Sequence, residues 1–179
     1  MLKRIMTLLL IVCVLSLQSC VSAANGLQSY VDTYDGYEFA YPNGWLPVKV
    51  TNGPDVVFRD LVNETENVSV VISPVPEGKT LEDLGTPTEV GYQLSKSITA
   101  ASDSERNVEL LNATAKKTDT ETYYILEYGV KLANQARHNL ASTVVRRGKL
   151  FTFNASTTER RWSKVKELLE IAVNSFSVY

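Results

Sequence analysis

Two β-rich runs that meet at a glycine turn constrain this chain more than any other feature. Residues 143–146 and 149–155 are rich in β-branched and aromatic side chains, as strands are. Between them lie Arg147 and Gly148, and glycine accepts the positive φ that a two-residue hairpin turn requires. The segment therefore predicts a β-hairpin in which residues of the two strands face each other across this turn.

An amphipathic helix is expected directly after the hairpin. Ser156 and Glu159 have the spacing of a capping box, which predicts that the helix begins there. Apolar side chains then recur at helical spacing and would cover one face of a sheet. They are Trp162, Val165, Leu168, Leu169, Ala172, Val173 and Phe176.

The rest of the chain adds strands and one more helix. Tyr37–Tyr41 alternates apolar side chains, and a Pro-Asn-Gly turn then leads to a second arm, 45–50, which predicts a first hairpin. A second helix is expected over 87–101, with Pro87 at its first position. The other strands are expected at 56–60, 67–75, 108–116, 122–132, 138–146 and 149–155. This order predicts an α+β fold, an α-β-α sandwich with a central antiparallel sheet flanked by helices.

The N-terminus resembles a bacterial lipoprotein signal. A short basic head is followed by an apolar run over 5–17 and then by Cys20, whose thiol would receive the lipid. This interpretation divides the chain into a signal peptide (1–19), a lipidated tether (20–29) and one domain (30–179). The alternative is a secreted protein cleaved after Ala24. An uncleaved anchor has the least support, because a spanning helix needs about 20 apolar residues.

Composition argues for one globular domain and against nucleic acid as a partner. The 179 residues are 44% hydrophobic and 21% charged, as in ordinary globular proteins. Without Lys3 and Arg4, the chain would carry 16 basic and 20 acidic residues, a net charge of −4. A nucleic-acid binder would show the opposite balance.

Several short segments, taken together and in order, resemble the PsbP family of extrinsic proteins on the lumenal side of photosystem II. They are 34–45, 57–60, 64–70, 148–153, 161–162 and 174–178. The resemblance implies an α-β-α sandwich that binds photosystem II or its assembly intermediates and is not an enzyme. Because a lipoprotein signal replaces a chloroplast transit peptide, the chain most resembles the cyanobacterial members. We therefore expect it on the lumenal side of the thylakoid membrane, anchored through Cys20.

The family is linked to calcium and chloride retention at the oxygen-evolving complex. The plant N-terminal extension that matters for ion retention has no clear counterpart in 21–29, so an assembly or stabilisation role is expected for this chain. No cofactor is expected to be required. The alternative is a metal-binding lumenal lipoprotein that acts as a carrier or sensor.

The metal hypothesis concerns His138, the only histidine of the chain. Across the predicted turn, His138 faces Thr157 and lies near Glu159. Plant members have a histidine and a carboxylate at matching places that look like a metal-binding pair, which implies zinc, manganese or calcium here. The competing interpretation is structural, with His138 at the end of a sheet face and Glu159 as the capping-box acid. A single histidine cannot build a multi-histidine zinc site, and the sequence has no nucleophile elbow, which together argue against a hydrolase.

Basic residues near the hairpin form a second candidate site. A patch there could dock on acidic lumenal loops of the photosystem, although solvated charge at a turn is the commoner explanation. Its members are Arg146, Arg147, Lys149, Arg160 and Arg161. The acidic loop 60–66 lacks the spaced carboxylates of a calcium loop and is expected to be solvated.

Overall fold

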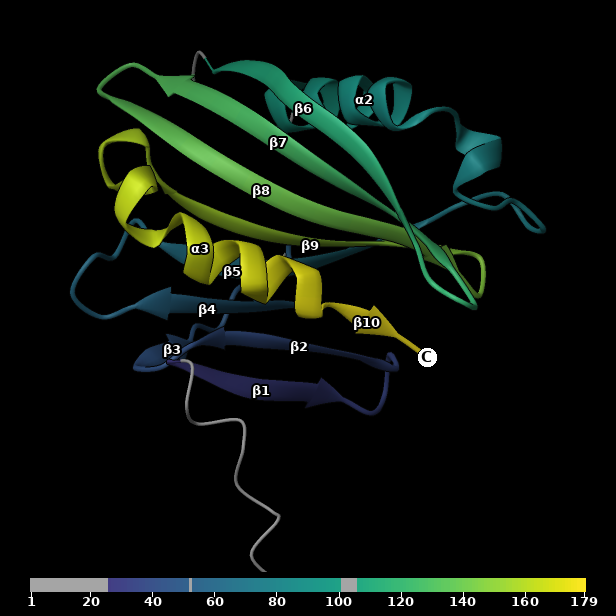
Figure 1. Cartoon of the computed structure of the whole chain (residues 1–179), viewed down its shortest axis with the longest axis horizontal. Helices are drawn as coiled ribbons and strands as arrows, with labels where there is room; N and C mark the ends of the chain where they lie inside the picture. Colours follow the sequence, from purple (N-terminus) through teal and green to yellow (C-terminus); the bar gives the residue numbers. More distant parts are fainter. Residues whose placement is uncertain (1–25, 52, 101–105) are drawn as a thin grey trace, which may run out of the picture.

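A computed structural model describes residues 26–51, 53–100 and 106–179, and it places their strands in two antiparallel sheets (Figure 1). The smaller sheet has the order β1-β2-β10 and the larger one β3-β4-β5-β9-β8-β7-β6. The elements are β1 (Leu27–Asp32), β2 (Tyr37–Pro42), β3 (Trp45–Pro47), β4 (Val56–Asp60), β5 (Asn67–Pro74), a 3-10 turn (Glu82–Leu84), α2 (Pro87–Ala100), β6 (Asn107–Lys117), β7 (Thr122–Leu132), β8 (Gln135–Arg146), β9 (Lys149–Thr158), α3 (Glu159–Ser175) and β10 (Ser177–Val178).

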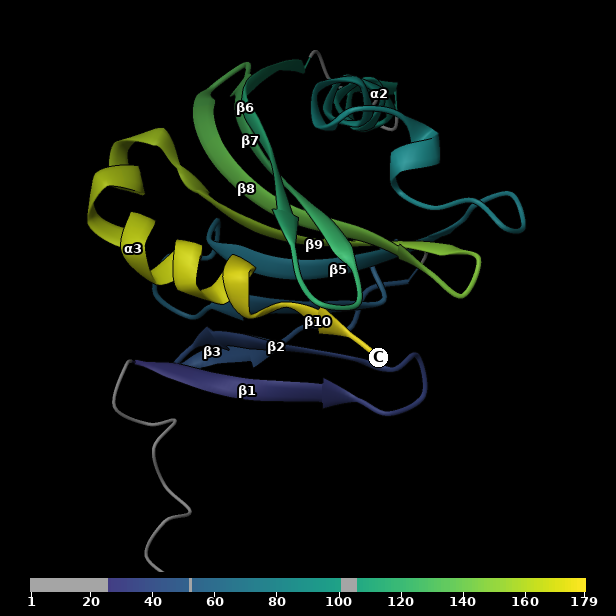
Figure 2. The ribbon, with the colours of Figure 1, turned by 45° about the vertical axis from the view of Figure 1, so that its right-hand side comes forward.

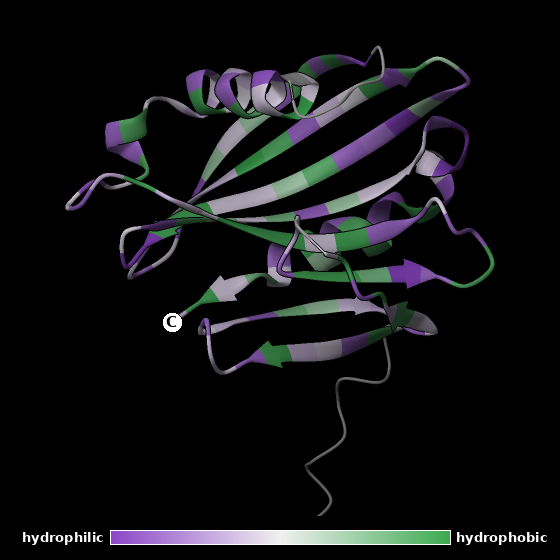
Figure 3. Ribbon diagram, turned by 180° about the vertical axis from the view of Figure 1, so that it is seen from behind, coloured by the Kyte–Doolittle hydropathy of each residue, from purple (hydrophilic) through white to green (hydrophobic). Residues whose placement is uncertain are grey.

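The two helices cover opposite faces of the larger sheet (Figure 2). In β8, Leu140 and Val144 belong to the core that α3 closes, whereas Ala141 and Val145 belong to the core under α2. This alternation follows from the two-residue period of a strand. Seen from behind, apolar and polar residues follow one another along the strands beside α2 (Figure 3). The α+β prediction with helices on both faces therefore agrees with the structure.

The sequence predicts a single sheet, whereas the structure contains a second, smaller one. It packs on the same side as α3, where Phe39 of β2 meets Phe153 of β9 with ring centroids 4.6 Å apart. Both rings are almost completely buried. The core on this side is thus shared by a helix and a second sheet, and the simple α-β-α description is incomplete.

The predicted hairpin between 37–41 and 45–50 is wrong. After Pro42 the chain turns through Gly44, whose φ is +83°, and passes from one sheet to the other. β2 pairs with β1 and β10, whereas β3 pairs with β4. Crossing between the sheets lets the aromatic face of β2 pack against β9, which a pairing with the three-residue β3 would not achieve.

The C-terminal hairpin has the predicted register, but its helix starts differently. Arg146 pairs with Lys149 and His138 with Thr157, as a two-residue turn requires. Ser156 remains in β9, where it pairs with Asn67 and Asn139. The N-cap of α3 is Thr158, which makes no side-chain capping hydrogen bond, so the capping-box prediction is wrong. Cross-strand pairing of Ser156 keeps that residue extended.

The domain begins before the predicted boundary at residue 30. Leu27 is only 6% exposed and pairs with Pro42, so 27–29 belong to β1 and not to a tether. Residues 1–25, with the predicted signal peptide and Cys20, lie outside the described part of the chain. Within the described residues, no helix has the length and apolar character needed to cross a membrane.

Candidate functional site around His138

Three strands and the start of α3 bring His138 between two carboxylates. In the pairing of β7 with β8, His138 faces Gly129, and in the pairing of β8 with β9 it faces Thr157. Gly129 has no side chain, and Glu127, two residues earlier on the same face of β7, lies diagonally across from the ring. Glu159, the first residue of α3, approaches from the other side.

Both nitrogens of the imidazole have a carboxylate partner. Its Nδ1 lies 2.9 Å from Oε2 of Glu159, and its Nε2 lies 2.7 Å from Oε1 of Glu127. The ring also stacks on Trp162, with centroids 3.8 Å apart and an angle of 11° between the planes. His138 is 4% exposed, whereas the side chain of Glu159 is 53% exposed. The cluster therefore joins β7, β8 and α3, and presents one carboxylate to solvent.

This geometry defines what the cluster can do chemically. An ionised carboxylate only accepts hydrogen bonds, so both contacts are hydrogen bonds when the ring carries both of its protons. Nδ1 and Nε2 point in different directions. A metal ion at either nitrogen would therefore meet only that nitrogen and the one carboxylate beside it. No group of three or more His, Cys, Asp or Glu within the described residues is arranged to hold a metal. The structure thus brings His138 and Glu159 together, as predicted, in a cluster that also includes Glu127.

A buried carboxylate beside the cluster fixes the first turn of α3. Glu66, at 2% exposure, accepts a hydrogen bond from Oγ1 of Thr157 at 2.8 Å and one from the guanidinium of Arg161. The hydrogen bond to Glu66 raises the pKa of Arg161. A buried charge is tolerated when it is paired and hydrogen-bonded, and here the pair ties the β4–β5 loop to the helix.

The five basic residues do not form one patch. Arg146, Arg147 and Lys149 lie at the β8–β9 turn, whereas Arg160 and Arg161 begin α3. The ten residues of β9 separate these two ends, which corresponds to roughly 30 Å of strand. The prediction of a single docking patch is wrong, because the two groups of basic residues are close in sequence but lie at opposite ends of β9.

Most of these charges also have partners. Arg146 pairs with Glu121, and Nζ of Lys149 lies 2.8 Å from Oδ1 of Asp35. Arg147 donates to the backbone carbonyls of Asp35 and Tyr179 and so links the large sheet to the small one. These residues therefore stabilise contacts within the domain.

The register across the β8–β9 turn does not locate Glu127, because this residue lies on β7. Leu132 and Gln135 flank a two-residue turn at Ala133 and Asn134, and β7 pairs with β8 across it. Counting residues across that turn places Gly129 opposite His138 and Glu127 beside it. The helical periodicity predicts that Trp162 packs on the sheet, but it does not indicate the contact with His138.

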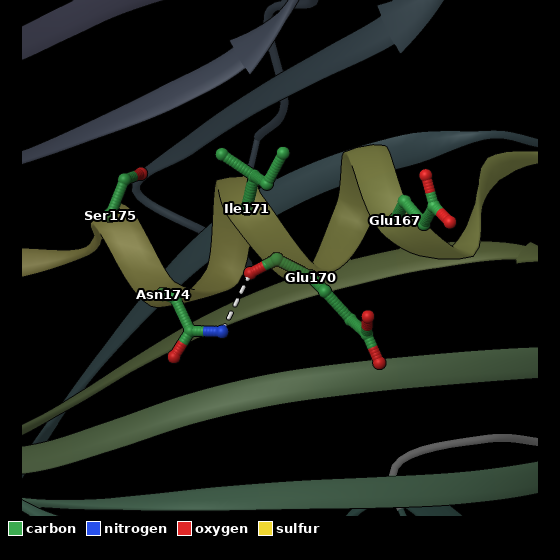
Figure 4. Close-up of a pocket in the computed structure, with 5 residues that line it drawn as sticks. All are labelled: Glu167, Glu170, Ile171, Asn174 and Ser175. Atoms are coloured by element: carbon green, nitrogen blue, oxygen red, sulfur yellow. Dashed lines mark hydrogen bonds between the residues drawn. The ribbon is translucent and has the colours of Figure 1, made fainter.

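A hollow along the C-terminal half of α3 is another concave feature of the described part of the chain (Figure 4). All five residues that line it belong to that helix, and Nδ2 of Asn174 donates to the carbonyl of Glu170 at 2.9 Å. It contains none of the predicted site residues and no converging set of charged groups. The His138 cluster is therefore the better candidate.

A sequence model of the PsbP family matches residues 25–178. The chain belongs to the PsbP family. CyanoP of Thermosynechococcus vestitus is 50% identical over 184 residues, and CyanoP of Synechocystis sp. is 48% identical over 188 residues, with each alignment covering the whole of both chains. The resemblance seen in the short segments is thus confirmed over the full domain.

Solved structures give the same result for the PsbP fold. The solution structure of CyanoP from Synechocystis sp. superimposes with a TM-score of 0.76 at 50% identity and covers 92% of this chain and 99% of its own. LpqN of Mycobacterium tuberculosis has a TM-score of 0.52 at 12% identity, covering 86% of this chain and 92% of its own. The latter likeness is one of fold alone.

PsbP-like protein 1 of Arabidopsis thaliana, a chloroplastic protein, is 32% identical, over 90% of this chain and 69% of its own.

Proposed function

We propose that this protein is a lumenal, photosystem II-associated member of the PsbP family that acts in assembly or stabilisation and is not an enzyme. The observation that carries the proposal is the 50% and 48% identity to two CyanoP proteins along their whole lengths. At this identity the fold is shared, in agreement with the TM-score of 0.76 for CyanoP of Synechocystis sp.. A thylakoid location follows from the same relatives.

The His138 cluster supports a binding role through rigidity. Its ring fixes the beginning of α3 to β7 and β8, while Glu159 and the exposed Arg160 lie at the surface of the same helix turn. A preformed surface loses little conformational entropy when it binds. We infer that this end of the domain contributes to the contact with photosystem II proteins.

A lipid on Cys20 would raise the local concentration of the domain at the membrane. Tethering turns a second binding step into an intramolecular one and increases apparent affinity without new contacts. A weak protein contact would then be sufficient for function.

Co-purification tests the proposal. A C-terminal affinity tag is placed on the wild-type protein and on Cys20→Ser, both expressed in a cyanobacterium, and thylakoids are solubilised gently. We expect photosystem II reaction-centre or assembly proteins with the wild type and a reduced yield with Cys20→Ser. Recovery of the wild-type protein alone, from a preparation in which these complexes remain intact, would overturn the photosystem II association.

The metal-binding function is the second candidate. The observation that favours it is the approach of Nδ1 of His138 to within 2.9 Å of Oε2 of Glu159, whose side chain is 53% exposed. One nitrogen and one oxygen make a weak zinc or manganese site unless water or a partner chain completes it. Zinc titration of the wild type against His138→Ala separates the two functions, since equal stoichiometry would exclude this site.

A further inference from the structure

An exposed pair of aliphatic side chains lies at the end of the domain where the N-terminal segment enters. Leu61 and Val62, in the loop after β4, are 64% and 87% exposed. Isolated exposed aliphatic residues are common on proteins, but two adjacent ones at a loop tip are a stronger feature. Leu46 in β3, whose partner in β4 is Arg59, is 49% exposed near the same end. The loop after β4 is coloured hydrophobic where it begins, at the edge of the molecule (Figure 3).

The loop that carries this pair is held in one conformation. Oδ1 of Asp60 accepts a hydrogen bond from the backbone N–H of Val62 at 2.9 Å, and Oδ2 accepts one from Nδ2 of Asn63 at 2.9 Å. The backbone closes the loop with a hydrogen bond from Glu66 to Asn63 at 2.7 Å and one from Asp60 to Glu66 at 3.1 Å. Leu61 and Val62 are thus presented outward on a fixed loop, which lowers the entropy lost on docking.

The pairing of strands places the loop close to the start of the domain. The carbonyl of Gly26 accepts a hydrogen bond from the N–H of Asn43 at 2.8 Å, and two residues later Trp45 pairs with Asp60. Leu61 follows directly. Figures 1 and 2 show the start of β1, the β2–β3 turn and the loop after β4 at one end, with the β1–β2 turn at the other.

The length of chain between Cys20 and Gly26 determines how far the domain can lie from a lipid on that cysteine. Five residues separate the two positions, so even a fully extended chain spans at most about 20 Å. A domain tethered at this distance keeps its N-terminal end against the membrane surface.

We propose that Leu61 and Val62 insert into the lipid interface next to the anchor and fix the orientation of the domain on the membrane. This rests on the lipid attachment at Cys20 that forms part of the proposed function. A lipid surface is the binding partner, because the short tether holds this end of the domain near the membrane. Apolar side chains at the tip of a loop also become more stable when they leave water. Glu64 is exposed in the same loop, which favours an uncharged or zwitterionic surface over an anionic one.

A single environment-sensitive fluorophore tests the insertion. In the mature lipoprotein the thiol of Cys20 is blocked by lipid and Cys13 is removed with the signal, so Val62→Cys provides one free thiol. The lipidated protein is labelled there and reconstituted into phosphatidylcholine vesicles that contain nitroxide-labelled lipid. Tyr34→Cys is the matched control, because Tyr34 is 94% exposed in the β1–β2 turn at the opposite end. We expect several-fold stronger quenching and a blue shift at position 62 only.

Three other results would overturn the proposal. Equal, weak quenching at both positions in protein that floats with the vesicles would show that the anchor holds while the loop stays in water. Protection of position 62 only after photosystem II membranes are added would identify a protein as the occupant. If neither the wild type nor Cys20→Ser floats with the vesicles, there is no lipid anchor, and the insertion proposal fails with it. Photosystem II co-purification could still succeed in that case.

Discussion

Replacing His138 by alanine should destabilise the domain even though no metal or partner is present. The change removes the two ring nitrogens, which lie 2.7 and 2.9 Å from carboxylate oxygens of Glu127 and Glu159, and the ring that stacks on Trp162 at 3.8 Å. Each hydrogen bond to a charged group contributes roughly 1.5–3 kcal/mol when buried, but the exposure of Glu159 reduces its share to that of a surface pair, about 0–1 kcal/mol. Aromatic stacking adds about 0.5–1.5 kcal/mol.

The expected loss is therefore about 2–5.5 kcal/mol of unfolding free energy at neutral pH. Equilibrium urea unfolding, followed by tryptophan fluorescence and by circular dichroism, measures it as a lower midpoint with an unchanged slope. His138→Gln should recover part of the loss, because its amide keeps a donor. A double-mutant cycle with Trp162→Leu should show coupling between the two rings. A loss below about 0.5 kcal/mol, typical of a surface substitution, would refute the view that this cluster fixes α3 to the sheet.

Two further predictions concern other buried polar groups. Glu66→Gln keeps the volume but removes the charge paired with Arg161, and should cost about 1.5–3 kcal/mol in urea unfolding, against almost no change for the exposed Glu64→Gln. Burial, and then the hydrogen bond to Asp55, raises the pKa of Tyr37 above its ordinary 10.0. The stabilisation linked to that proton is therefore present below pH 10.0 and falls as pH rises above it. Tyr37→Phe should flatten this alkaline loss in thermal unfolding; an identical alkaline profile would contradict the assignment.

Local features of the sequence determined most of the individual elements. The Arg147-Gly148 turn predicted the β8–β9 register, which placed His138 opposite Thr157 and near Glu159. Thr86 and Glu89 exchange hydrogen bonds at the start of α2, where Pro87 predicted a helix. Turn chemistry and helical periodicity act between residues close in the chain, so they can be recognised without the fold.

Only the tertiary structure decided which strands pair and which charges meet. The alternation of Tyr37 and Phe39 is the same whether β2 pairs with β3 or with β10, and packing against Phe153 selects the second sheet. Ser156 has the spacing of a helix cap, yet its cross-strand partners keep it extended. Strand pairing and side-chain contacts depend on groups distant in sequence, and the free energy of burying them together outweighs local preference. For the same reason the sequence could suggest His138 with Glu159, but the fold added Glu127 and Trp162.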